Sequence, residues 1–160
     1  MVFLSSVVEA GAYVGAGASL VRIKTDTGST GPVLAGVTLG YAKDVHKLEL
    51  VVMSSVKDDS LNQLVTDIPQ ASSLLYRYTM NPSNSLHLDL IVGYSQVEVE
   101  SSYVLVPTFT ETFRSGSFGI GLEEALKSIP RLKFKLDFIR LYHGGNLKIN
   151  SFNAGFRYEF

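Results

Sequence analysis

The last eleven residues, Asn150–Phe160, constrain the fold of this chain more than any other segment. Every second position from Phe152 onward is apolar, mostly aromatic, whereas the positions between are small, polar or charged. A strand sends alternate side chains to opposite faces, so this segment predicts a β-strand with one aromatic face and one polar face. The printed chain stops on the aromatic face, at Phe160.

The same alternation recurs along the chain. Seven further segments show it, at residues 12–20, 33–41, 47–52, 73–79, 86–95, 117–123 and 132–138. Together with the terminal segment they predict eight strands, which is the smallest even number found in single-chain outer-membrane barrels.

The predicted connections alternate in length. Short links are expected at Ala42–Val45, Asn81–Ser85 and Ala125–Arg131, and longer ones at Lys24–Pro32, Ser54–Gln70, Glu98–Thr112 and His143–Lys148. Transmembrane barrels have short periplasmic turns and longer extracellular loops. Both termini are therefore expected on the periplasmic side.

Alternation alone does not decide which face meets lipid. A soluble eight-stranded barrel or a β-sandwich would bury the apolar face and expose the polar one. Glycine favours the membrane barrel, because a narrow lumen leaves little room for side chains, whereas glycine on a solvent face would only weaken the sheet. The glycines on the polar face are Gly15, Gly17, Gly36, Gly40, Gly93, Gly119, Gly121 and Gly155. The sequence therefore predicts an all-β fold, an eight-stranded antiparallel transmembrane β-barrel.

Several of these strands resemble a known group of proteins. Residues 119–123, 132–142 and 155–160 resemble the opacity-protein and OmpA-type transmembrane-domain superfamily, and Tyr13–Gly17 is similar to the first strand of that group. The resemblance implies a stand-alone small barrel in the bacterial outer membrane, with no peptidoglycan-binding domain after it. The terminal strand also resembles the C-terminal insertion signal of such barrels. That likeness implies an assembly signal for the barrel-assembly machinery, made of Phe152, Phe156, Tyr158 and Phe160.

Charged residues on the polar face predict a polar network inside the barrel. Five acidic and five basic side chains are available to cross a lumen that is just wide enough for side chains. Because an uncompensated buried charge is costly, these side chains are expected to neutralise one another and to plug the lumen. The predicted network consists of Lys47, Glu49, Arg77, His87, Asp89, Glu123, Lys133, Lys135, Asp137, Arg157 and Glu159.

Some positions fit the pattern less well. Arg140 falls on the apolar face of its strand unless a β-bulge shifts the register. Glu124 falls there too, within a run of helix-forming residues at 121–127. Aromatic side chains are expected at the two membrane interfaces. They are Tyr41, Tyr78, Tyr158 and Phe160 at the short-turn end, and Tyr94 and Tyr142 at the loop end.

The composition argues against several kinds of function. A net charge of −1 with no Lys/Arg run gives no basis for nucleic-acid binding. Without cysteine there is no disulfide and no thiolate metal site. His46, His87 and His143 have no metal-ligand spacing, and the glycine motifs at 15–17 and 116–121 open no βαβ unit. We expect no metal, no cofactor and no enzymatic activity.

Two other functions stay open. A lipid A-modifying enzyme would need a nucleophile and a base on the lipid-facing surface, for which His143 with a nearby serine is the remaining candidate. A narrow pore is the other alternative.

We expect one monomeric barrel domain over residues 1–160, with about residues 1–9 as an N-terminal extension. The start of the chain lacks the features of a signal peptide, which is expected to have been removed. A surface-binding, adhesin-like role or an envelope-structural role is expected, with loops 54–70 and 98–112 contacting a host or envelope protein. Outer-membrane lipid and lipopolysaccharide are the other expected partners.

Overall fold

The computed structural model describes residues 10–160, so the expected extension at residues 1–9 lies outside the described residues. The strands are β1 (Gly11–Thr25), β2 (Gly28–Thr30), β3 (Val33–Lys43), β4 (His46–Lys57), β5 (Asp59–Leu61), β6 (Leu64–Thr79), β7 (Leu86–Tyr103), β8 (Phe109–Leu126), β9 (Ile129–Gly144) and β10 (Leu147–Glu159). In residues 10–160, no helix is both long enough and apolar enough to span a membrane.

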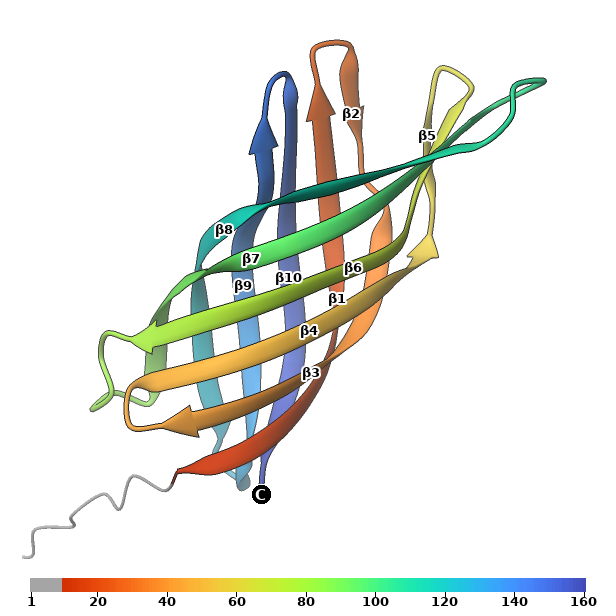
Figure 1. Ribbon diagram of the computed structural model, residues 1–160. Coiled ribbons are helices and arrows are strands. Elements are labelled where there is room, and N and C mark those ends of the chain that lie inside the picture. Colours follow the sequence, from red (N-terminus) through yellow and green to blue (C-terminus); the bar gives the residue numbers. More distant parts are fainter. Residues whose placement is uncertain (1–9) are drawn as a thin grey trace, which may run out of the picture.

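Eight long strands form a closed antiparallel barrel (Figure 1). Each pairs with its neighbour in the order β1, β3, β4, β6, β7, β8, β9 and β10, and β10 returns to pair with β1 from Tyr13↔Glu159 to Lys24↔Lys148. The short strands β2 and β5 pair with β1 and β6 in hairpins at one end. The predicted eight-stranded antiparallel barrel is confirmed.

The outer wall carries an apolar belt. Leu20, Val37, Leu74, Ile120 and Phe156 are among the large apolar side chains that face outward and stay exposed on the isolated chain. Their strand neighbours face the lumen, as the period of two requires. Tyr41, Tyr78, Tyr158 and Phe160 lie on the outer face at the short-turn end.

The longer connections consist mostly of strand. Segments 54–70 and 98–112, expected as loops, are hairpins in which β4, β6, β7 and β8 continue past the apolar belt. Pairing of β6 with β7 reaches Leu64↔Tyr103, and pairing of β7 with β8 reaches Ser101↔Phe109. The predicted longer connections are therefore mostly extensions of the strands, because the ladders continue through them.

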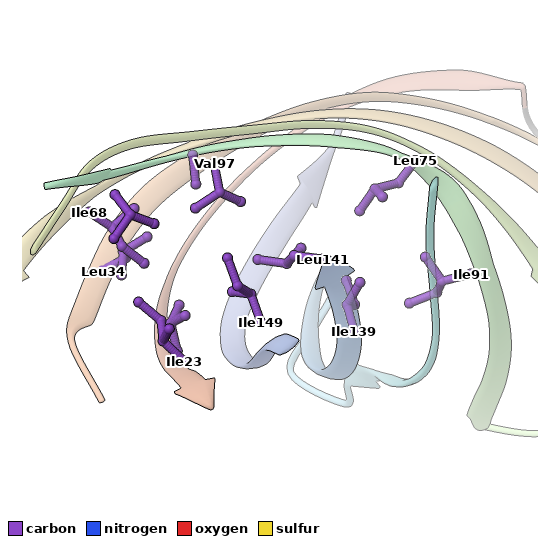
Figure 2. Close-up of a cluster of buried hydrophobic side chains, with 12 residues drawn as sticks. Ile23, Leu34, Ile68, Leu75, Ile91, Val97, Ile139, Leu141 and Ile149 are labelled. Carbon is purple, nitrogen blue, oxygen red and sulfur yellow. The ribbon is translucent and has the colours of Figure 1, made fainter. Parts of the chain in front are cut away.

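The lumen contains an apolar half that the sequence analysis did not expect. At the long-hairpin end, aliphatic side chains from around the barrel point inward and pack together (Figure 2). The cluster consists of Val21, Ile23, Leu34, Ile68, Ala71, Leu75, Ile91, Val97, Val99, Ile139, Leu141 and Ile149. The expectation of a polar lumen therefore holds for the short-turn half alone.

A bulge in β9 changes the position of one predicted girdle residue. The pairing of β9 with β10 skips Leu141, because Asn150 pairs with Arg140 and Ile149 pairs with Tyr142. Tyr142 consequently shares the inward face of buried Ile149 and stacks at an angle on Phe113, with ring centroids 5.1 Å apart. Its expected place in the outer girdle was wrong.

The bulge comes after Arg140 and does not move it inward. Arg140 pairs with outward-facing Phe118 and with Asn150, and it lies on the outer wall. Glu124 also faces outward, where it pairs with Leu86 and Phe134.

The helix-forming residues at 121–127 are strand up to Leu126, because ladders on both sides satisfy the backbone there. Local helix preference is weak compared with this pairing.

Candidate functional site

Arg77 is at the centre of the charged half of the lumen. Its guanidinium contacts three carboxylates on three other strands: Glu49 at 3.1 Å, Asp89 at 3.1 Å and Asp137 at 2.5 Å. Arg77 is 0% exposed. Such a planar group with five N–H donors suits several carboxylates at once.

Glu123 is the matching acidic centre. Its carboxylate lies 2.6 Å from Arg157 Nε and 3.1 Å from Lys47 Nζ, with His87 Nδ1 at 3.8 Å and Lys133 Nζ at 4.0 Å. These four partners come from four other strands. They meet Glu123 because all five side chains lie on the inward face near the short-turn end.

Shared partners join the two centres. Lys47 Nζ lies 2.9 Å from Asp89 as well as near Glu123, so it links the Arg77 and Glu123 groups. Lys135 Nζ lies 2.7 Å from Glu49. Glu159 closes the edge of the network at the short-turn end, with contacts of 2.9 Å to Lys133 and 2.8 Å to Arg157. The structure thus brings all eleven residues singled out in the sequence into one connected network.

Two network members were missed by sequence reasoning. The Tyr13 hydroxyl donates to Glu49 at 2.8 Å, and the Thr79 hydroxyl donates to Asp89 at 2.7 Å. Both side chains are buried. Tyr13 stands on the glycine-bearing face of its strand, so the alternation alone places it in the lumen, whereas the predicted network is drawn from charged residues and histidine.

Two glycines make room for the network. A Cβ at Gly40 would collide with the Tyr13 ring, and a Cβ at Gly121 would collide with Arg77 and Asp137. Both glycines face the lumen, where a strand residue ordinarily sends a side chain. The glycines therefore define where the largest groups of the network can lie.

The lumen is closed in two ways. Near the short-turn end, five acidic and five basic side chains fill it and compensate one another. Beyond them, the aliphatic cluster fills it. Serine hydroxyls between the aliphatic side chains bond to one another, Ser73 to Ser95 at 2.6 Å and Ser19 to Ser151 at 2.9 Å. A hydrated ion would have to displace both layers to cross.

Above the aliphatic cluster, the hairpins enclose a cup of about 380 Å³. Leu61, Leu64, Val99, Phe113 and Leu147 supply apolar surface in its lining. Hydroxyl groups and one carboxylate also line it, from Thr25, Thr27, Ser29, Thr30, Thr66, Ser101 and Glu111. Since the cluster forms its floor, the cup is a recess and not the entrance of a channel.

The aromatic residues of the terminal strand all lie on the outer wall. Phe152, Phe156, Tyr158 and Phe160 are exposed on the isolated chain. Phe156 packs against Phe134 of the neighbouring strand with ring centroids 5.3 Å apart, and Tyr158 packs edge-on against Phe160 at 5.7 Å. These four residues thus present one aromatic edge next to the seam between β10 and β1.

A closed antiparallel barrel with an apolar outer belt and a charged network inside it defines a small outer-membrane β-barrel. Residues 5–160 match the family described as "Outer membrane protein beta-barrel domain", and the chain belongs to this family. The protein is located in the bacterial outer membrane, with the short turns periplasmic and the long hairpins extracellular. A comparison with curated proteins by sequence finds no match.

Solved structures share the fold. Ail, the attachment invasion locus protein of Yersinia pestis, in complex with the heparin analogue sucrose octasulfate, is 14% identical with a TM-score of 0.69, covering 95% of this chain and 99% of that chain. Neisserial surface protein A is 15% identical with a TM-score of 0.67, covering 95% and 99%. OprG from Pseudomonas aeruginosa is 14% identical with a TM-score of 0.63, covering 95% and 97%. Identities this low show likeness of fold alone.

Proposed function

We propose that this outer-membrane protein is a surface-binding protein whose barrel is a closed anchor and whose extracellular hairpins contact a partner. The observation that carries the proposal is the apolar tip of the β7–β8 hairpin. Tyr103, Val104, Leu105, Val106 and Phe109 are all exposed there, Val104 at 71%. The hairpin reaches farther out from the barrel wall than the β5–β6 hairpin beside it (Figure 1).

The apolar tip is unusual for a segment outside the membrane belt. The strand parts that lead to it carry polar residues, including Glu98, Glu100, Thr110 and Glu111. Contiguous apolar side chains rimmed by polar ones mark interaction surfaces on proteins. The tip also belongs to a connection between two strands. In such connections the sequence can vary without disturbing the barrel wall.

A closed lumen supports an anchor and argues against the narrow pore. The charged network and the aliphatic cluster lie in series, so opening one leaves the other in place. An anchor of this kind needs neither a metal nor a cofactor, and among residues 10–160 no group of three His, Cys, Asp or Glu side chains is placed to hold a metal ion. We propose a non-enzymatic, monomeric single-domain barrel.

The apolar character of the β7–β8 tip indicates the kind of partner. An apolar tip of five side chains fits a recess on a protein better than it fits a polysaccharide, so we propose a host or envelope protein as the partner. One neighbour in fold, the attachment invasion locus protein of Yersinia pestis, is named for attachment, which supports a role at surfaces for barrels of this shape. The competing function is an envelope-structural role, which would need the barrel wall but no extracellular binding surface.

Surface display tests the proposal. Cells producing the protein are assayed for binding to cultured host cells and to immobilised matrix proteins, with Leu105→Asp combined with Val104→Asp as the tip variant. Val56→Asp is the matched control, because Val56 is also exposed, at 67%, on a different extracellular strand end. Loss of binding in the tip variant alone supports the proposal. Equal binding by the parent, the tip variant and a strain without the protein would contradict the proposal and favour the envelope-structural role.

A further inference from the structure

A group of four cations lies on the outer wall at the extracellular ends of β1, β9 and β10, and we call it the cationic face. It consists of Arg22, Lys24, Arg140 and Lys148. The register places them side by side: Arg22 pairs with Asn150, which pairs with Arg140, and Lys24 pairs directly with Lys148. Their neighbours in sequence, Val21, Ile23, Ile139 and Ile149, are buried in the lumen, so the cations face outward.

The cations are close together. Neighbouring strands lie about 4.8 Å apart, and residues two positions apart on one strand lie about 7 Å apart. Lys24 and Lys148 occupy directly opposed positions, an arrangement in which like charges destabilise a sheet. Within residues 10–160, the ion pairs of the structure include none of these four side chains.

One of the cations, Arg140, is oriented by uncharged groups. Arg140 Nε donates to the Asn150 side-chain oxygen at 3.0 Å, and its guanidinium lies 5.7 Å from the centre of the Phe118 ring. Both contacts fix the direction of the group but neither supplies a negative charge. The arginine is therefore oriented for an anion that comes from outside the chain.

The cationic face borders directly on the lipid-facing belt. Leu20 and Phe138 lie two positions closer to the membrane centre than Arg22 and Arg140, and Phe152 lies four positions closer than Lys148. All three are exposed on the isolated chain. The cations thus stand where the hydrocarbon region ends and headgroups begin. A ligand that satisfies both surfaces has acyl chains beside anionic groups.

Lys and Arg side chains at a membrane interface commonly extend toward water. That tendency by itself would distribute cations around the whole extracellular rim of the barrel. The opposite wall differs. Asp67, Glu98 and Glu100 lie at the outward positions of β6 and β7, and Asp67 pairs with Glu100 in the ladder. That wall also carries exposed cations, Lys57 on β4 and Arg114 on β8, so its charges are mixed. The cationic face differs because the ladder partners of its four cations include no carboxylate.

We propose that the cationic face binds the phosphate groups of a phosphorylated glycolipid of the outer leaflet, a lipopolysaccharide molecule, whose acyl chains lie along Leu20, Phe138 and Phe152. Arg22, Lys24 and Lys148 contact the phosphates, and Arg140 contacts a phosphate or an adjoining sugar oxygen. This inference rests on the outer-membrane location and does not depend on the proposed partner of the β7–β8 tip.

Native mass spectrometry of the purified barrel in detergent tests the proposal, with diphosphorylated lipid A and its dephosphorylated form as probes. We expect the parent to retain the phosphorylated lipid roughly tenfold better, in a salt-sensitive manner. The variant with Arg22→Gln, Lys24→Gln, Arg140→Gln and Lys148→Gln should lose this preference. The control with Asp67→Asn, Glu98→Gln and Glu100→Gln neutralises the opposite wall and should keep it.

Folding is checked on the same samples by β-strand circular dichroism. If the fourfold variant does not fold, Lys24→Gln with Lys148→Gln is used, which removes two charges and relieves their mutual repulsion. Equal retention of both lipids by the parent would overturn the proposal, as would an unchanged preference in a folded variant. Displacement of the lipid by an equal concentration of inorganic phosphate would also overturn it, because the lipid would then not be the occupant.

Discussion

The Arg157 guanidinium lies over the ring of Tyr13, 4.2 Å from the ring centre, and so joins the last strand of the barrel to the first. The same ring carries the hydroxyl that donates to Glu49, on the far side of β3. Because the barrel closes between β1 and β10, this contact ties the closing seam to the charged network. A buried contact between a cation and an aromatic face contributes about 2 kcal/mol.

Tyr13→Phe keeps the ring and removes the hydroxyl. We expect the free energy of unfolding in lipid or detergent, measured by urea titration, to fall by about 1–2 kcal/mol, because Glu49 loses one of its donors. Tyr13→Ala also removes the surface under Arg157 and should cost more. A Tyr13→Phe variant less stable than Tyr13→Ala would contradict this account of the seam.

Arg157→Ala leaves Glu123 buried with fewer partners. We expect it to lower the free energy of unfolding by about 3–5 kcal/mol, as removal of one member of a buried ion pair does. Conductance should change little, because the aliphatic cluster still fills the other half of the lumen. Planar-bilayer recording tests both parts of the idea: stable, wide conductance in the intact protein would show that the lumen is not closed.

Gly121→Ala inserts a methyl group where Arg77 and Asp137 meet. Both side chains are held by other partners, so we expect the pair to be displaced and the thermal unfolding temperature to fall. Gly116→Ala is the matched control, because it lies on the same strand facing outward, where a Cβ has its nearest neighbour at 3.9 Å. Equal losses in the two variants would mean that strand preference, and not the network, determines the effect.

Deletion of Phe160 should impair assembly in the outer membrane. The residue ends the aromatic edge beside the β10–β1 seam, and we propose that this edge is what the barrel-assembly machinery recognises. Cell fractionation should show less folded barrel in the membrane and more aggregated or degraded chain in the periplasm. Phe160→Tyr keeps the aromatic ring and should assemble normally; equal membrane levels of the truncated and parent chains would remove the proposal.

The sequence by itself determined the eight strands of the barrel wall, the face on which side chains lie wherever no bulge intervenes, and the composition of the charged network. These follow from a period of two, which is local and readable over a few residues, as at Phe152–Phe160. Arg77 and Arg157 had to face inward once their strands were placed.

Tertiary structure decided what depends on the pairing between strands. Whether Arg77 meets Asp137 or another carboxylate depends on a register that crosses several strands, and the bulge that turns Tyr142 inward is visible only in the ladder. The aliphatic half of the lumen escaped prediction for a related reason. Leu34 and Ile149 look like ordinary strand residues until barrel closure brings inward faces from opposite walls together. Closure likewise brings Arg22 and Lys24, near the start of the chain, beside Arg140 and Lys148, near its end.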